Sequence, residues 1–155
     1  MAVETYKSNH TDGVSRLFPV DRTGKLRFHR VKVPAANIAA VGDIASTFEL
    51  GSLPAGRFVV IPNLSYVQCS AWGAARTLSI GHRAYATELG VTVAEDAVAF
   101  STALDVSAAA IKQFANAELT FDVFSRAGVD LFGKLAGGTV PIGATLEVLL
   151  AYILE

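Results

Sequence analysis

Hydrophobic and polar residues alternate along most of the chain after residue 25. The segment 26–33 starts this pattern, and in 44–50 Ile44, Phe48 and Leu50 alternate with small or polar residues, with Ser46 interrupting the apolar side. A two-residue period is typical of strands with one buried face. The same reasoning predicts extended segments at 57–72, 73–85, 98–107, 118–125, 129–138 and 144–155.

Turn-forming residues separate these segments. Leu53-Pro54-Ala55-Gly56 has proline and glycine at the positions that a type I turn favours, so the chain is predicted to reverse there. Pro62 cannot donate to a central ladder and predicts a bulge or an edge position. Arg126-Ala127-Gly128 predicts a hairpin, and residues 92–97 (TVAEDA) are compatible with a helical turn.

About eight strands with little helix indicate an all-β chain, a β-sandwich of the jelly-roll type. The final segment, 144–155, is apolar on both faces, which predicts burial on both sides by a partner sheet or by another subunit. We expect two parts: residues 1–34 form an extended N-terminal arm and the first strand, and residues 35–155 form the sandwich domain.

The composition is unusually poor in charge. Of the 155 residues 52% are hydrophobic and 17% are charged, and the mean hydropathy is +0.42. No run is long enough for a membrane-spanning helix, and residues 1–13 lack the features of a signal peptide, so we expect a soluble chain without membrane contact. The low charge favours a surface that meets other proteins. The alternative is that the abundant alanines overstate the hydrophobicity.

Charge divides the chain at residue 34. Residues 1–34 carry seven basic and three acidic side chains, whereas 35–155 carry six basic and eleven acidic ones. Docking on an acidic protein surface, nucleic-acid binding and a solvated tail all remain open for the arm, and a protein surface is favoured because the aromatic residues are too scattered for base stacking. The candidate docking residues are Tyr6, Lys7, Arg16, Phe18, Arg22, Lys25 and Arg27.

No motif indicates catalysis. The three histidines (His10, His29 and His82) lie far apart in sequence, and no nucleophile elbow or phosphate-binding loop occurs. Neither His10 with Asp12 nor Glu95 with Asp96 has convincing metal-ligand spacing. The single cysteine, Cys69, is predicted to be an inert core thiol. We therefore predict no enzyme activity, no catalytic or metal site and no cofactor.

The aromatic residues leave two interpretations open. Trp72, the only tryptophan, is either a core residue or a contact residue at a subunit interface. Together with Tyr66 and Tyr85 it also offers a weak candidate platform for carbohydrate binding.

Four segments, GDIASTFELGSLPAGRFVV, ARTLSIGHRAY, FSTALDVSAAA and GGTVPIGATLEVLLAYIL, occur in this order between Gly42 and the C-terminal region. Together they resemble small β-rich virion proteins of tailed bacteriophages. The resemblance implies a capsid decoration, or cement, protein, made in the bacterial cytoplasm and bound to the major capsid protein on the outside of the head. It also implies a homotrimer, and we take Trp72, Leu149 and Ile153 as candidate interface residues.

Two alternatives stay open beside this role. One is another virion component, such as a head-fibre base, a connector or a tail protein. The other is a carbohydrate-binding adhesion module.

Overall fold

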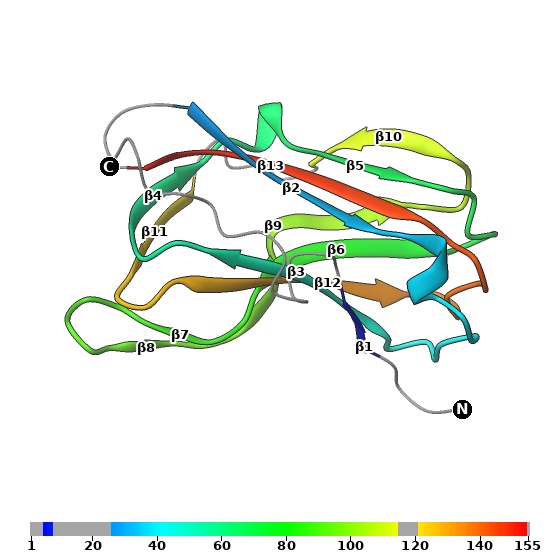
Figure 1. The fold of residues 1–155 in the computed structure, drawn as a ribbon, viewed down its shortest axis with the longest axis horizontal. Coiled ribbons are helices and arrows are strands. Elements are labelled where there is room, and N and C mark those ends of the chain that lie inside the picture. Colours follow the sequence, from blue (N-terminus) through cyan, green and yellow to red (C-terminus); the bar gives the residue numbers. More distant parts are fainter. Residues whose placement is uncertain (1–4, 8–25, 115–120, 155) are drawn as a thin grey trace.

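A computed structural model describes residues 5–7, 26–114 and 121–154. Two β-sheets lie one over the other, and no α-helix occurs among the described residues (Figure 1). The strands are β1 (Thr5–Lys7), β2 (Leu26–Val33), β3 (Thr47–Leu53), β4 (Gly56–Val60), β5 (Tyr66–Cys69), β6 (Thr77–His82), β7 (Tyr85–Ala86), β8 (Thr92–Val93), β9 (Asp96–Asp105), β10 (Ala110–Gln113), β11 (Phe121–Ser125), β12 (Val129–Ala136) and β13 (Leu146–Leu154). Two short 3-10 helices, η1 (Ala35–Asn37) and η2 (Pro62–Leu64), connect them.

Sheet A has the order β1-β3-β12-β6-β9, and sheet B has the order β10-β5-β13-β4-β11 with β2 paired to β13. The strand β13 is central in sheet B. Along one edge it pairs with β2, and along the other it pairs first with β5 and then with β4. The neighbour of β13 on that side is therefore one strand broken into two pieces, β4 and β5, with η2 between them.

The topology is a set of nested antiparallel pairs. The pair β7–β8 forms the innermost hairpin, and around it lie β6–β9, β5–β10, β4–β11, β3–β12 and β2–β13. One long two-stranded ribbon, wound over itself into two sheets, is the arrangement of a jelly roll. The predicted all-β, jelly-roll-like sandwich is confirmed.

The ribbon changes sheet where both of its strands bend together. Leu53 to Gly56 carries β3 of sheet A into β4 of sheet B, and Ser125 to Gly128 carries β11 back into β12. The two corners touch: a Cβ on Gly128 would lie 2.7 Å from the carbonyl oxygen of Leu53, and the φ of Gly128 is +102°. Only glycine fits this close approach without strain.

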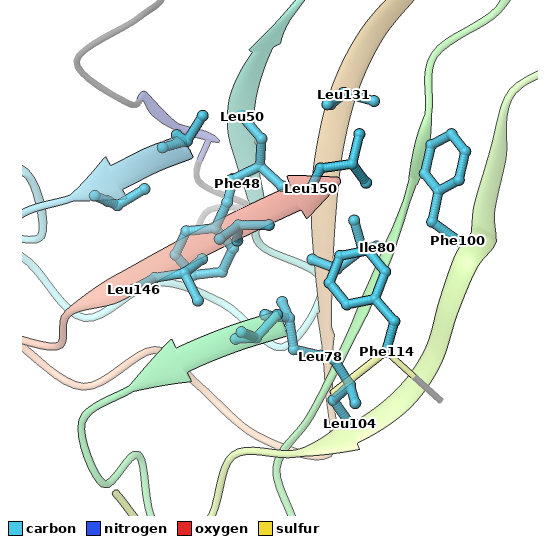
Figure 2. Close-up of a cluster of buried hydrophobic side chains, with 14 of the residues drawn as sticks. Phe48, Leu50, Leu78, Ile80, Phe100, Leu104, Phe114, Leu131, Leu146 and Leu150 are labelled. Atoms are coloured by element: carbon cyan, nitrogen blue, oxygen red, sulfur yellow. The ribbon is translucent and has the colours of Figure 1, made fainter. Parts of the chain in front are cut away.

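The core lies between the sheets and takes alternate residues from each. Phe48 and Leu50 of β3 and Leu78 and Ile80 of β6 meet Leu150 of β13 from the opposite sheet (Figure 2). Each of these side chains is at most 1% exposed. The two-residue period therefore encodes the inner face directly.

The polar core residue His29 ties the two sheets together. It lies on β2 of sheet B, and its Nε2 lies 2.8 Å from the backbone carbonyl oxygen of Leu50 on β3 of sheet A. Next to this contact, β1 pairs in parallel with β3 over Thr47 to Glu49. Both contacts cover the same edge of sheet A, where an open strand would invite unwanted pairing.

Several local expectations need correction. Residues 92–97 hold β8 and the start of β9 rather than a helical turn, because they continue the ribbon. The turn at residues 126–128 is not a hairpin, because β11 and β12 belong to different sheets. Pro62 interrupts the long strand completely and begins η2. The first strand, expected at residues 26–33, is β2 and pairs with β13 in sheet B.

Candidate docking surface

The outer face of sheet B carries a row of partly exposed apolar side chains. The strand register places Leu26 beside Ile153, Ile153 beside Val59, and Phe28 beside Ala151. Leu149 follows on the same face of β13. We name Leu26, Phe28, Val59, Leu149 and Ile153 the apolar face.

The sequence produces this face because β2 and β13 carry apolar residues at positions that point outward. In β2, Val31 and Val33 point into the core, whereas Leu26 and Phe28 are 44% and 49% exposed. In β13 the core takes Leu146, Val148, Leu150 and Tyr152, while Leu149 and Ile153 stay half-buried outside. We therefore treat the apolar face as a candidate contact surface, since soluble monomers rarely expose large apolar patches.

A charged cluster borders the apolar face at one end of sheet B. Glu147 of β13 forms ion pairs with Arg30 and Lys32 of β2, the latter at 3.0 Å. Hydrogen bonding from Arg30 lowers the pKa of the Glu147 carboxyl below its ordinary value of 4.5, and Lys32 adds to the effect. Two cations share one carboxylate, so the cluster carries one net positive charge.

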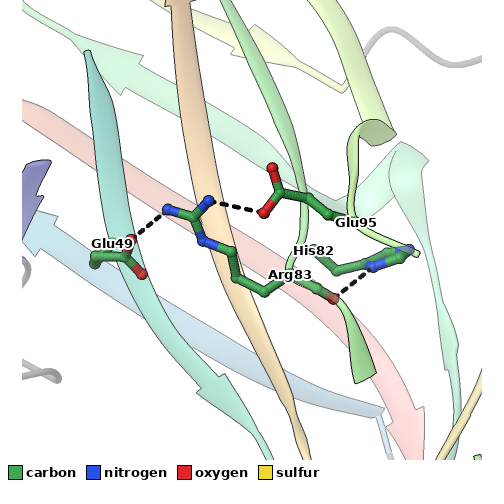
Figure 3. A network of polar contacts seen from close by, with 4 residues as sticks. All are labelled: Glu49, His82, Arg83 and Glu95. Carbon is green, nitrogen blue, oxygen red and sulfur yellow. Dashed lines mark hydrogen bonds and ion pairs between the residues drawn. The ribbon is translucent and has the colours of Figure 1, made fainter. Parts of the chain in front are cut away.

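The outer face of sheet A is polar and closely tied together. Arg83 binds Glu49 at 2.6 Å and Glu95 at 2.8 Å, so it joins β3 to the segment before β9 (Figure 3). Its guanidinium carbon also lies 4.1 Å from the centre of the Phe132 ring, which it covers. Burial lowers the pKa of Arg83, but hydrogen bonds to Glu95 and Glu49 outweigh it and raise the pKa overall. This network therefore holds one guanidinium between two carboxylates.

The described residues hold no cluster of metal-ligating side chains. No group of three or more His, Cys, Asp and Glu side chains comes together among them. The ring of His82 packs edge-on against Tyr85 and Phe100, and its Nδ1 lies 3.0 Å from the carbonyl oxygen of Arg83. Cys69 is buried, as predicted, and burial raises the pKa of its thiol above the ordinary value of 9.0.

No helix in the described ranges 5–7, 26–114 and 121–154 has the length and apolar character to cross a membrane.

The candidate arm residues fall mostly outside the described part of the chain. Arg16, Phe18, Arg22 and Lys25 lie there, so their docking role stays a prediction. Tyr6 and Lys7 lie in β1 beside Phe48 and Glu49 of β3.

Arg27 is the remaining candidate, and it lies in β2 opposite Tyr152. Burial raises the pKa of the Tyr152 hydroxyl, and the charge of Arg27 opposes that rise. Arg27 therefore lies next to Tyr152 in sheet B, and its docking role stays a prediction.

Of the three candidate interface residues, Leu149 and Ile153 belong to the apolar face, but Trp72 does not. Trp72 is 2% exposed, its ring packs 5.3 Å from that of Phe48, and its Nε1 donates to the carbonyl oxygen of Thr145 at 3.3 Å. The core alternative holds for Trp72, because the corner after β5 turns its ring inward. Its burial also removes the tryptophan from the candidate carbohydrate platform.

The sequence analysis missed Leu26 and Phe28. The signal was present, since both alternate with residues of the first strand that prove to be buried. The signal is obscured because the same segment also carries basic residues, which favour a solvent-exposed arm.

Comparison with solved structures finds a similar fold in a phage particle. A chain of the capsid of Ralstonia phage GP4 aligns over 97% of this chain and 98% of that chain, with a TM-score of 0.71 and 15% sequence identity. A chain of the infectious bursal disease virus Gx strain aligns over 91% of this chain and 40% of that chain, with a TM-score of 0.39 and 13% identity. This score is too low to indicate a shared fold. Neither known protein families nor curated proteins give a match.

The alignment with the phage capsid chain extends over almost the whole of both chains. The likeness therefore covers the whole fold of this chain rather than one sheet motif.

Proposed function

We propose that this chain is a decoration protein of a bacteriophage head, bound to the major capsid protein on the capsid exterior and assembled as a trimer. The observation that carries the proposal is the full-length agreement in fold with a chain of a phage capsid. The two unlike sheet faces add to it. On one face Arg83 pairs with two carboxylates, and the other face leaves apolar side chains half exposed.

The proposed role is to stabilise the assembled shell by binding across its surface. Docking buries the apolar face, and burial of apolar surface favours association. A protein that binds the assembled shell, and not its separated subunits, stabilises the shell by mass action without any reaction. The basic arm steers and orients this docking toward an acidic surface.

Mixing the purified chain with capsids that lack it tests the proposal. We expect saturable binding over the whole shell, measured by co-sedimentation, and a capsid that resists heating better when coated. Absence of binding to any capsid would refute the proposal. Binding of a few copies at one vertex would favour the alternative, a head-fibre base, connector or tail component.

A deletion tests the arm separately. It should remove residues 1–24 and stop there, because β2 begins at Leu26 and pairs with β13 through eight consecutive residues. The deletion also removes β1 from the edge of sheet A, so thermal unfolding must first show that the shortened chain is folded. We expect it to keep its sheet B and to bind capsids more weakly. Equal binding by the shortened and full-length chains would show that the arm takes no part in docking.

A further inference from the structure

The innermost hairpin, β7–β8, projects beyond the sandwich at one end of the molecule (Figure 1). Its tip is held by three hydrogen bonds. The backbone N–H of Thr87 donates to the carbonyl oxygen of Val91 at 2.8 Å, that of Gly90 donates to Thr87 at 2.9 Å, and that of Val91 donates to the Thr87 hydroxyl at 3.1 Å. The tip therefore has one defined shape and is pre-organised to present its side chains.

The side chains that the tip presents are apolar. Leu89 is 90% exposed, the most exposed of the large hydrophobic residues described, and Val91 is 61% exposed. Glu88 is the one charged residue between Tyr85 and Val93. An ordered projection that ends in a leucine next to an acid has the character of an anchor residue with a charged neighbour.

A pocket of about 350 Å³ opens at the other end of the sandwich. The ends of β2 and β5 and the start of β13 line it, with Pro34 and Leu146 among its apolar residues and Lys32, Gln68, Thr145 and Glu147 among its polar ones. Cavities of roughly 150 Å³ already admit a benzene-sized group, so a leucine side chain fits. Lys32 and Glu147 belong to the charged cluster, which has one net positive charge.

We propose that Leu89 of one copy enters this pocket on the next copy, where Glu88 lies against the positive charge of the cluster. The hairpin and the strand ends that line the pocket lie at opposite ends of the long axis (Figure 1), so the tip cannot reach the pocket of its own chain. A contact between two different patches is heterologous and closes into a ring when the rotation per copy allows it. This inference deepens the proposed function, and the number of three copies rests on that proposal.

The first test is the native mass of the full-length chain, measured by light scattering over a range of concentrations. We expect a trimer for the unmodified chain. Leu89→Asp should weaken association at least roughly tenfold, since it removes a buried apolar side chain from the contact. Val98→Asp is the matched control, because Val98 is also exposed (45%) but lies on β9, and it should leave the mass unchanged.

The second test captures the contact covalently. In a Cys69→Ala background, Leu89→Cys is combined with Thr145→Cys at the pocket, and mild oxidation should give a ladder of linked chains. Leu89→Cys combined with Ala55→Cys, at the exposed corner between β3 and β4, should not. Linkage of the control pair alone, or of neither pair, would overturn the proposal.

The outcomes separate this proposal from the proposed function. A chain that stays monomeric and unlinked overturns the hairpin contact, and so does a trimer that persists in Leu89→Asp. Loss of capsid binding in Leu89→Asp at unchanged native mass would assign the hairpin to the shell protein and also overturn it. Whether the unmodified chain binds capsids at all is decided independently by co-sedimentation.

Discussion

The double substitution Leu26→Ser and Phe28→Ser should weaken capsid binding. Both side chains are about half exposed, at 44% and 49%, so docking can bury the remaining half of each. Complete burial of such a side chain contributes about 1.5–3 kcal/mol, so the two exposed halves together contribute roughly 1.5–3 kcal/mol. That free energy corresponds to a loss of about 10- to 150-fold in affinity.

Co-sedimentation of the variant with undecorated capsids, titrated over chain concentration, measures this loss. The matched control is Ile44→Ser with Val98→Ser, because these residues are similarly exposed and lie outside the apolar face. Thermal unfolding of each variant checks that β2 remains paired. If the variant binds with unchanged affinity while the protein is folded, the apolar face is not the docking surface.

Three further predictions concern the isolated chain. Gly137→Ala should lose at least roughly 2 kcal/mol in denaturant unfolding, because φ is +82° and the new Cβ would lie 1.9 Å from a carbonyl oxygen. Gly90→Ala, with φ +79° and open space around it, should lose only about 1 kcal/mol of unfolding free energy. If Gly137→Ala and Gly90→Ala lose equal amounts, the clash at Gly137 does not contribute. Glu147→Gln should lower the melting temperature more at pH 7 than at pH 3, because a folded-state pKa below the ordinary 4.5 stabilises the protein above that pH, and this stabilisation is lost progressively as the pH falls through the folded-state value. An equal loss at both pH values would place the effect elsewhere. Arg83→Lys should lose about 1 kcal/mol of unfolding free energy in urea, since an ammonium cannot bridge both carboxylates and cover the Phe132 ring. An unchanged free energy of unfolding would mean that this network does not stabilise the fold.

The strands themselves could be predicted well from the sequence. In β3 and β6 the alternation of apolar and polar residues sets the inner face, with Phe48, Leu50, Leu78 and Ile80 buried and Glu49 and Ser79 between them. The failures occurred where a neighbouring strand decides the outcome. Residues 92–97 have no strong pattern, and they are extended because they complete the inner hairpin.

The candidate surface could be predicted only in part. The apolar outer positions of β13 pointed to Leu149 and Ile153 correctly as outward residues, since a strand that is apolar on both faces needs cover on both. Trp72 was ambiguous because the direction of its ring depends on the corner after β5, which local pattern does not define. Leu26 and Phe28 could be assigned to the apolar face only from the pairing of β2 with β13.

The sequence alone determined that this chain is all-β and that its last strand is apolar on both faces, because side-chain direction in a strand follows the two-residue period. The tertiary structure alone decided which strands pair, that the turns at 53–56 and 125–128 are corners between sheets, and that the apolar face and the projecting hairpin lie where they do. These features depend on contacts between residues far apart in the chain, such as Leu26 with Ile153, and no local pattern records such distances.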